Sequence, residues 1–345
     1  MALQYVLIFF SLQIKEIHMK IRKLGKLGPN VSAIGFGAMS ITGFFGPTDD
    51  TTSQECLKAA YDCGIDFFDT ADVYGSGSSE TLIGKFLKDT KAKIKIATKA
   101  GIQTKPLRQF NNSKDYLTQS LDMSLKRLGV DYVDLFYIHR READRPIEEV
   151  VQTLKEFIGA GKIGGYGLSE ISPTTLRRAH SVHPCMAVQS EYSLWSRMPD
   201  MGLIRTCDEL GVAFVPFSPL GRGMLTDRPA KRENMVPPDL RINNPRFIEP
   251  NLSDNLSMLK PFQGWAADNG MTTATAALAW VLSRGENLIP IPATRTAKHL
   301  IEWVGASEIT LTPKQIKEID DILPIGWAYG DRYSVSQYVG PETYC

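Results

Sequence analysis

Short apolar runs alternate with longer amphipathic segments along most of the chain. The apolar runs are rich in Ile, Val and Phe, which is typical of buried strands, and the segments between them repeat apolar positions with helical spacing. The predicted strands cover residues 33–37, 67–70, 94–98, 133–138, 164–168, 186–190, 213–217 and 288–291. The predicted helices cover residues 53–63, 79–87, 116–128, 147–158, 174–180, 201–210 and 273–283.

This alternation predicts an α/β fold with a parallel sheet whose strands are joined by crossover helices. Eight strand segments favour closure of the sheet into a (β/α)8 barrel. A doubly wound open sheet is the alternative, but no G-x-G-x-x-G motif follows a predicted strand, which disfavours that fold.

Three segments lie outside the alternation. Residues 20–34 predict an N-terminal β-hairpin around a turn of Gly, Pro and Asn. Residues 218–255 are irregular and rich in Pro, Asn and Arg, which indicates either a functional lid or a disordered segment. A C-terminal helix is predicted over 313–323, and the aromatic residues of the tail 324–345 either roof a pocket or pack outside the barrel. These aromatic residues are Trp327, Tyr329, Tyr333, Tyr338 and Tyr344.

Residues 1–18 precede a more typical start at Met19. Their apolar stretch is too short to span a bilayer and has neither preceding basic residues nor a cleavage site of small residues. We expect a single domain over 19–345, with 1–18 as an extension outside the fold or, alternatively, as a peripheral or oligomer-contact segment.

Composition excludes few functions. The 345-residue chain has a formal net charge of +1, which gives no reason to expect nucleic acid as a partner. Its five cysteines are scattered without a C-x-x-C motif, so neither a disulfide framework nor a zinc site is expected. No His-x-His or carboxylate cluster suits a divalent metal. We expect a cytoplasmic protein with no membrane partner.

Chemically active side chains end three successive predicted strands. Asp69 and Tyr74 follow the second strand, Lys99 ends the third strand's segment, and His139 ends the fourth. Because a parallel barrel gathers the carboxyl ends of its strands on one face, these side chains are expected to converge there. Each has an ordinary structural explanation when taken alone, such as a turn aspartate or a core histidine, so the hypothesis depends on all four together.

Several motifs resemble the aldo-keto reductase family, from about residue 20 to residue 331. They are GIDFFDTADVYG at 64–75, LKRLGVDYVDL at 125–135, IHR at 138–140, GLSE at 167–170, QSEYSLW at 189–195, PFSPLGRG at 216–223 and IPIPATR at 289–295. The IHR, SLW and SPLGRG segments look most like the plant auxin-induced-protein and perakine-reductase branch and its bacterial relatives. The resemblance implies a (β/α)8 barrel, an extended NADP(H) cofactor without a Rossmann domain, and reduction of aldehydes or ketones to alcohols.

The four converging residues have distinct expected roles in such a reduction. A nearby ammonium favours a phenolate, so Lys99 is expected to lower the pKa of Tyr74, the general acid. Asp69 is expected to hold Lys99 in place by an ion pair. His139 is expected to donate a hydrogen bond to the substrate carbonyl and to stabilise the developing alkoxide charge.

The resemblance also implies the cofactor contacts. The expected cofactor-binding residues are Met39, Asp69, Ser169, Gln189, Phe217, Ser218, Leu220, Gly221, Arg222, Gly223, Pro292, Ala293, Thr294, Arg295, His299 and Glu302. By resemblance, Ser169 and Gln189 bind the nicotinamide carboxamide and Phe217 stacks on the ring. The 218–223 loop crosses the pyrophosphate, where Arg222 acts as a latch or is an ordinary solvated arginine. The 292–295 segment grips the 2′-phosphate through Thr294 and Arg295, which favours NADPH over NADH.

The chain departs from the family pattern at four positions. Glu170 replaces an asparagine beside Ser169, Ala293 replaces a cation of some branches, and His299 stands where many members have arginine. Trp303 replaces an asparagine that contacts adenine, and either loosens adenine recognition or stacks on the base instead.

The expected substrate pocket is mostly apolar. Its predicted lining is Met39, Ile41, Phe44, Phe45, Tyr74, Trp195 and parts of 222–250. This lining favours hydrophobic, aromatic or aliphatic aldehydes and small ketones, and no cluster of basic residues indicates an acidic substrate. A regulatory subunit resembling potassium-channel β subunits, which keeps a cofactor site, is an alternative of another class, and an inactive barrel scaffold is a second.

Overall fold

A computed structural model describes residues 18–104, 108–343 and 345 of the chain. Residues 1–17 of the predicted extension and Tyr344 lie outside the described residues. A seven-stranded parallel sheet forms the centre of the molecule, in the order β11-β10-β9-β8-β5-β4-β3. Its strands are β3 (Phe36–Gly37), β4 (Phe67–Asp69), β5 (Lys95–Ala100), β8 (Leu135–Ile138), β9 (Tyr166–Ser169), β10 (Ala187–Glu191) and β11 (Ala213–Phe217). The predicted strands, apart from 288–291, are therefore confirmed in number and order.

The predicted eighth strand closes the barrel through single bridges. Leu288 and Ile291 pair with β11 in parallel orientation. On the other side, Gly35 and Gly37 donate backbone hydrogen bonds to the carbonyls of Pro290 and Pro292, at 2.9 and 3.0 Å. Proline has no backbone N–H to return to β3, so the pairing there is one-sided. The sheet is nevertheless closed, which confirms a TIM-barrel architecture.

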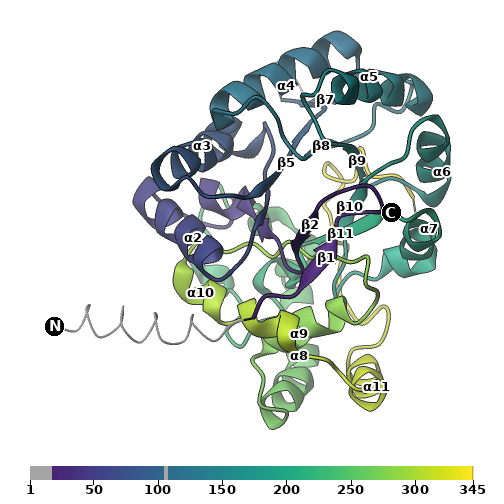
Figure 1. The fold of residues 1–345 in the computed structure, drawn as a ribbon. Helices are drawn as coiled ribbons and strands as arrows, with labels where there is room; N and C mark the ends of the chain where they lie inside the picture. Colours follow the sequence, from purple (N-terminus) through teal and green to yellow (C-terminus); the bar gives the residue numbers. More distant parts are fainter. Residues whose placement is uncertain (1–17, 105–107, 344) are drawn as a thin grey trace.

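Helices surround the sheet (Figure 1). The α-helices are α2 (Asp50–Asp62), α3 (Ser78–Thr90), α4 (Lys114–Leu128), α5 (Ile147–Gly159), α6 (Pro173–Val182), α7 (Leu203–Leu210), α8 (Asn251–Asp268), α9 (Thr273–Leu282), α10 (Ala297–Ile301) and α11 (Pro313–Ile322). Asp49 caps α2 by accepting from the Thr52 N–H at 2.8 Å, and Gly129 ends α4 in the left-handed conformation. α8 was not predicted, because Pro261 lies inside it and interrupts the expected pattern.

Short 3₁₀ segments fill the loops. They are η1 (Ala38–Thr42), η2 (Tyr74–Gly77), η3 (Met198–Met201), η4 (Gly221–Gly223), η5 (Arg232–Asn234), η6 (Leu240–Asn243), η7 (Pro245–Phe247) and η8 (Val304–Glu308). η4 to η7 lie in the irregular segment 218–255, which is therefore a series of ordered turns rather than a disordered stretch.

Two hairpins flank the barrel. The predicted N-terminal hairpin is β1 (Ile21–Lys23) paired with β2 (Asn30–Ser32), and it crosses one end of the barrel (Figure 1). Leu24 and Val31 of this hairpin are fully buried in the apolar cluster inside the barrel, so the hairpin closes that end. A second hairpin, β6 (Ile102–Gln103) with β7 (Gln109–Phe110), follows β5 and was not predicted.

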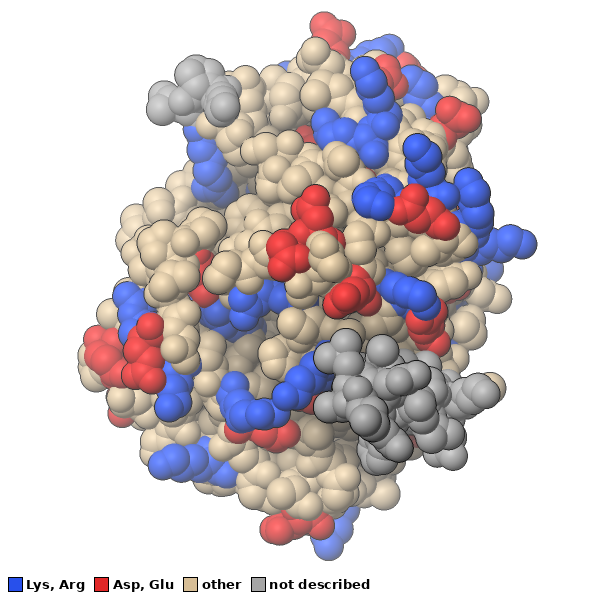
Figure 2. Space-filling view, turned by 90° about the vertical axis from the view of Figure 1, so that its left-hand side faces the viewer, with Lys and Arg blue, Asp and Glu red and all other residues tan. Residues whose placement is uncertain are grey.

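The surface has no single dominant charge on the face seen in Figure 2, where Lys and Arg side chains are interspersed with Asp and Glu. Within the described part of the chain, no helix is both long and apolar enough to cross a membrane. All five cysteines are buried and unpaired.

Candidate active site

The alternation of side chains along the strands points the predicted residues inward. Phe67 and Tyr137 belong to the apolar cluster inside the barrel. Because side chains two positions apart share a face of a strand, Asp69 and His139 also point inward, one step closer to the strand ends. On β5, Lys99 likewise lies two positions after a residue of this apolar cluster, Ala97. Three strands therefore direct polar groups to one end of the barrel.

A cavity of about 1190 Å³ opens at this end. The predicted site residues that line it are Met39, Asp69, Tyr74, His139, Ser169, Gln189, Phe217, Ser218, Leu220, Arg222, Gly223, Pro292, Ala293, Thr294, Arg295, His299 and Glu302. Lys99 and Gly221 are buried and do not line the cavity. The tertiary structure therefore gathers nearly all of the predicted residues around one space.

Lys99 joins the other members of the catalytic group. Its Nζ forms a buried ion pair with Asp69 and donates a hydrogen bond to the Thr70 carbonyl at 2.7 Å. The same Nζ lies 5.0 Å from the centroid of the Tyr74 ring. Gln189 donates to the second Asp69 oxygen at 2.8 Å, so that carboxylate is fixed on both sides.

Burial and charge together set the ionisation of this group. Burial disfavours the charged form of Lys99, but Asp69 and Tyr74 outweigh it and raise the pKa of the ammonium. Burial also raises the pKa of Tyr74, an effect that the Lys99 charge reduces without reversing. Lys99 therefore acts on the Tyr74 pKa in the expected direction, but the net shift is upward because the desolvation of the phenolate is the larger effect.

His139 lies beside Tyr74, with ring centroids 5.8 Å apart in an edge-to-face arrangement. Its pKa is well below the ordinary value because of burial and of the nearby charges of Arg140, Lys99 and Arg108. The imidazole is therefore neutral at physiological pH and can donate one N–H hydrogen bond. Its Nδ1 has no hydrogen-bond partner among the described residues.

The cavity holds the polar groups that a nicotinamide amide needs. The Ser169 hydroxyl accepts a hydrogen bond from Arg140 at 3.1 Å and still has its own O–H to donate. Gln189 also lines the cavity, and its amide group donates to Asp69 through Nε2, which leaves a carbonyl oxygen that can accept a hydrogen bond. Phe217 lines the cavity as an inward-facing aromatic at the end of β11, where a planar ring can stack.

The groups suited to a phosphate lie on the 292–299 segment. Arg295 donates to the Pro47 carbonyl at 3.0 Å, and among the described residues most of its five N–H donors have no other partner. Gly37 lines the cavity beside this segment, and a Cβ there would lie 2.8 Å from the Ile291 carbonyl, so only glycine fits. Trp303 also lines the cavity although it is only 2% exposed. These donors, the aromatic face and the amide-binding groups fit an extended nicotinamide dinucleotide.

The 218–255 segment is joined to the loop after β3 across the cavity. The Leu240 N–H donates to the Phe44 carbonyl at 3.0 Å, and Arg241 donates to the Phe45 carbonyl at 3.1 Å. Arg241 is itself held by Asp239 at 2.6 Å. The 218–255 segment is therefore ordered and contacts the loop after β3, and its function as a lid stays a prediction.

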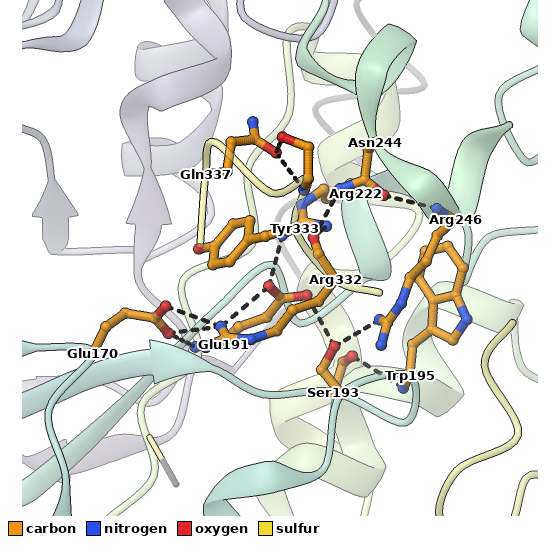
Figure 3. Close-up of polar contacts among 12 residues, drawn as sticks. Glu170, Glu191, Ser193, Trp195, Arg222, Asn244, Arg246, Arg332, Tyr333 and Gln337 are labelled. Carbon is orange, nitrogen blue, oxygen red and sulfur yellow. Dashed lines mark hydrogen bonds and ion pairs between the residues drawn. The ribbon is translucent and has the colours of Figure 1, made fainter. Parts of the chain in front are cut away.

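Two buried glutamates behind the cavity bind the C-terminal tail. Arg332 of the tail reaches between Glu170 and Glu191 (Figure 3). It donates to both Glu170 oxygens at 2.9 Å and lies 3.6 Å from Glu191. Glu191 also pairs with Arg222 at 2.6 Å, so Arg222 is buried in an ion-pair network and is not an ordinary solvated arginine. Glu170, which departs from the family pattern, is thus paired with an arginine of the C-terminal tail.

The C-terminal tail forms part of the cavity wall. Tyr333, Ser336 and Gln337 line the cavity, which confirms the prediction of a roof for these tail residues. Trp327 is instead buried against Trp195, with ring centroids 6.0 Å apart. The prediction that Trp195 lines the pocket is wrong for this reason, and buried Ile41 does not line it either. Met39, Phe44, Phe45 and Tyr74 do line it.

Sequence reasoning missed two arginines of the cavity, Arg108 and Arg140. Arg140 directly follows His139, a position that places it at the same strand end. Arg108 lies in the loop after β5, and loops after strands form the mouth of such a barrel. Arg140 belongs to the IHR motif but had no expected role at the site, and Arg108 belongs to no motif, so only the tertiary structure shows that both line the cavity.

Comparison with known proteins agrees with this geometry. A family model described as the Aldo/keto reductase family matches residues 33–324. A probable aldo-keto reductase 1 of Glycine max is 42% identical over 315 residues, covering 90% of this chain and 91% of that protein. The aldo-keto reductase yakc [NADP(+)] of Schizosaccharomyces pombe is 38% identical over 320 residues, covering 90% and 94%.

Solved structures share the fold. The glycerol dehydrogenase AKR11B4 of Gluconobacter oxydans superposes with a TM-score of 0.80 at 28% identity, covering 88% of this chain and 94% of that one. The holo form of the aldo-keto reductase AKR11C1 of Bacillus halodurans gives 0.75 at 27% identity, covering 92% and 100%. With a matching family model over most of its length and relatives of this similarity, the chain belongs to the aldo/keto reductase family of oxidoreductases.

Proposed function

We propose that this protein reduces aldehydes or ketones to alcohols with NADPH, and that Tyr74, Lys99, Asp69 and His139 carry the chemistry. The observation that supports this most is the buried Lys99–Asp69 ion pair beneath Tyr74, next to a neutral His139. A bound nicotinamide supplies the hydride. The protein must then supply a proton to the carbonyl oxygen and stabilise its developing charge.

Tyr74 is the proton donor in this proposal. Its raised pKa keeps the phenol protonated at neutral pH, so it is ready to donate. As the proton leaves, the Lys99 ammonium stabilises the phenolate that forms, and Asp69 keeps Lys99 charged and in place. The neutral His139 imidazole donates a hydrogen bond to the carbonyl oxygen, which orients the substrate and stabilises the alkoxide.

Cofactor binding is assigned to the remaining lining residues. Ser169, Gln189 and Phe217 hold the nicotinamide, and Arg222 and the backbone of 218–223 contact the pyrophosphate once Arg222 leaves Glu191. Thr294 and Arg295 bind the 2′-phosphate. The relatives' printed names support the cofactor, since the fission-yeast protein is named with NADP(+).

The test is NADPH oxidation, followed by nicotinamide absorbance, with a panel of neutral aldehydes. We expect turnover by the wild type, a decrease in kcat of about 100-fold or more in Tyr74→Phe because the proton donor is lost, and an unchanged Kd for NADPH. Tyr132→Phe removes a hydroxyl from an exposed residue outside the cavity and should behave as wild type.

Two results would contradict the proposal. Wild-type turnover in Tyr74→Phe would show that the proton comes from another group. NADPH binding by the wild-type protein without turnover of any carbonyl compound would favour the regulatory alternative instead.

A further inference from the structure

Two arginines share the His139 end of the cavity. Arg140 follows His139 directly, and Arg108 lies on the β6–β7 hairpin beside the cavity-lining residues Ile102 and Thr104. Both arginines line the cavity, although they are distant in sequence from each other. Together with Lys99, they lower the pKa of His139, so their charges act at the position where a carbonyl would be reduced.

The positive charges at this end are unequally compensated. Lys99 is paired with Asp69, and Arg140 lies 3.9 Å from Glu170. Arg108 has no ion-pair partner among residues 18–104, 108–343 and 345. One uncompensated positive charge therefore remains on the cavity wall near His139.

Arg108 is held in place but keeps free donors. Its NH1 donates to the Ser336 carbonyl of the tail at 3.1 Å, and its guanidinium lies 5.3 Å from the Phe110 ring centroid. These contacts fix the side chain without neutralising it. A guanidinium has five N–H donors and can bind a carboxylate or phosphate through two of them at once.

Arg140 is less available. It donates to the His139 carbonyl at 2.6 Å, to Ser169 at 3.1 Å and to the Tyr333 hydroxyl at 3.4 Å. Arg140 is therefore held by its protein contacts and contributes only its charge to the site. Arg108 is the arginine with N–H donors left to bind a substrate group.

We propose that the substrate carries an anionic oxygen group, a carboxylate or a phosphate, in addition to its carbonyl, and that Arg108 binds this group beside the tail residues Tyr333 and Ser336. This inference rests on the proposed reductase function. It replaces the expectation of an uncharged substrate, which the sequence supported because no basic cluster is visible along the chain.

The experiment compares matched aldehydes that differ in the charged group. The carboxylate pair is 4-formylbenzoate and 4-methylbenzaldehyde, and the phosphate pair is glyceraldehyde 3-phosphate and glyceraldehyde. In at least one pair we expect kcat/KM for the anion to exceed that for the neutral compound by about tenfold or more, because a charge-assisted bidentate pair is worth that much. The pair with the higher ratio identifies the group.

Arg108→Gln tests the residue itself. It should remove most of the preference, mainly by raising KM for the anion, while KM for NADPH and kcat/KM for the neutral aldehyde change far less, and Arg108→Lys should restore part of it. Arg205→Gln makes the same charge change at an exposed side chain outside the cavity and should keep the preference.

Equal turnover of both members in both pairs would overturn the proposal, as would an Arg108→Gln enzyme that keeps the preference. A selective rise in KM for NADPH in that variant would assign Arg108 to the cofactor and would equally overturn it. Failure of every aldehyde in both pairs, anionic and neutral, to react would instead contradict the reductase function itself.

Discussion

Burial and charged neighbours compete in setting the ionisation of individual residues at this site. At Tyr74 the loss of hydration outweighs the Lys99 charge, and the phenol stays protonated at neutral pH. At Lys99 the balance is reversed, because Asp69 and Tyr74 both favour the ammonium. Burial therefore dominates the pKa of the tyrosine, and charged neighbours dominate the pKa of the lysine. Only the three-dimensional surroundings of each residue decide which of the two effects is larger.

Asp72 allows the effect of burial on ionisation to be tested through the free energy of unfolding. It is held close to Glu80, and burial together with this repulsion raises its pKa from 3.8 to about 7. One of its oxygens, Oδ1, has no hydrogen-bond partner among the described residues. Between pH 4 and 7 the folded protein keeps a proton that the unfolded chain releases, so the free energy of unfolding should fall as pH rises through this range.

Asp72→Asn should remove this pH dependence. We expect the variant to be more stable than the wild type at pH 8, by on the order of 2 kcal/mol, with a smaller difference at pH 5. Urea unfolding at the two pH values measures it. Asp144→Asn, at an exposed position, is the control. An equal difference at pH 5 and pH 8 would mean that Asp72 does not titrate in this range.

Arg295→Ala tests the assignment of the 2′-phosphate site. Arg295 has free donors at the cavity wall, and NADH lacks the phosphate that they would bind. KM for NADPH should rise by about ten- to a hundredfold because hydrogen bonds to a charged group are lost. KM for NADH is the internal control and should change little. If both KM values rise equally, the 2′-phosphate is bound elsewhere.

At the scale of elements, the C-terminal tail is the part whose position the sequence left open. From the sequence, its aromatic residues could either roof the pocket or pack outside the barrel. In the structure, Trp327 packs in the core and Tyr333 lines the cavity. Trp327 packs on Trp195 and donates to the Leu194 carbonyl at 2.7 Å, whereas Tyr333 faces the cavity. Arg332, between them, joins the tail to the ends of β9 and β10.

Arg332→Met should destabilise the protein by about 3–5 kcal/mol, because it leaves the buried Glu170 without the arginine that donates to both of its oxygens. The double variant Glu170→Gln/Arg332→Met removes the stranded charge and should recover part of this loss. Urea unfolding of both variants measures the effect. A double variant that is no more stable than Arg332→Met would show that the tail is held mainly by apolar contacts such as Trp327.

At the scale of the whole molecule, periodicity was sufficient to predict the barrel. Alternating apolar strands and amphipathic helices have few ways to bury their faces, and eight strand segments favour closure. The segment 288–291 closes the barrel at the place of the predicted eighth strand, but it pairs through isolated bridges rather than as a continuous strand, and its prolines restrict hydrogen bonding on one side. α8 and the β6–β7 hairpin were missed because Pro261 and very short strands weaken the periodic signal.

The sequence by itself determined the order of the strands, and it placed Asp69, Lys99 and His139 at one end of a parallel barrel, because parallel strands end on the same face and side chains alternate along them. Only the tertiary structure decided what surrounds them. Arg108 and Arg140 line the same cavity as His139, Arg332 reaches Glu170, and Trp195 packs on Trp327 outside the cavity through contacts between segments far apart in the chain. Such contacts depend on how loops and the tail pack, and no local pattern of apolar and polar residues encodes them.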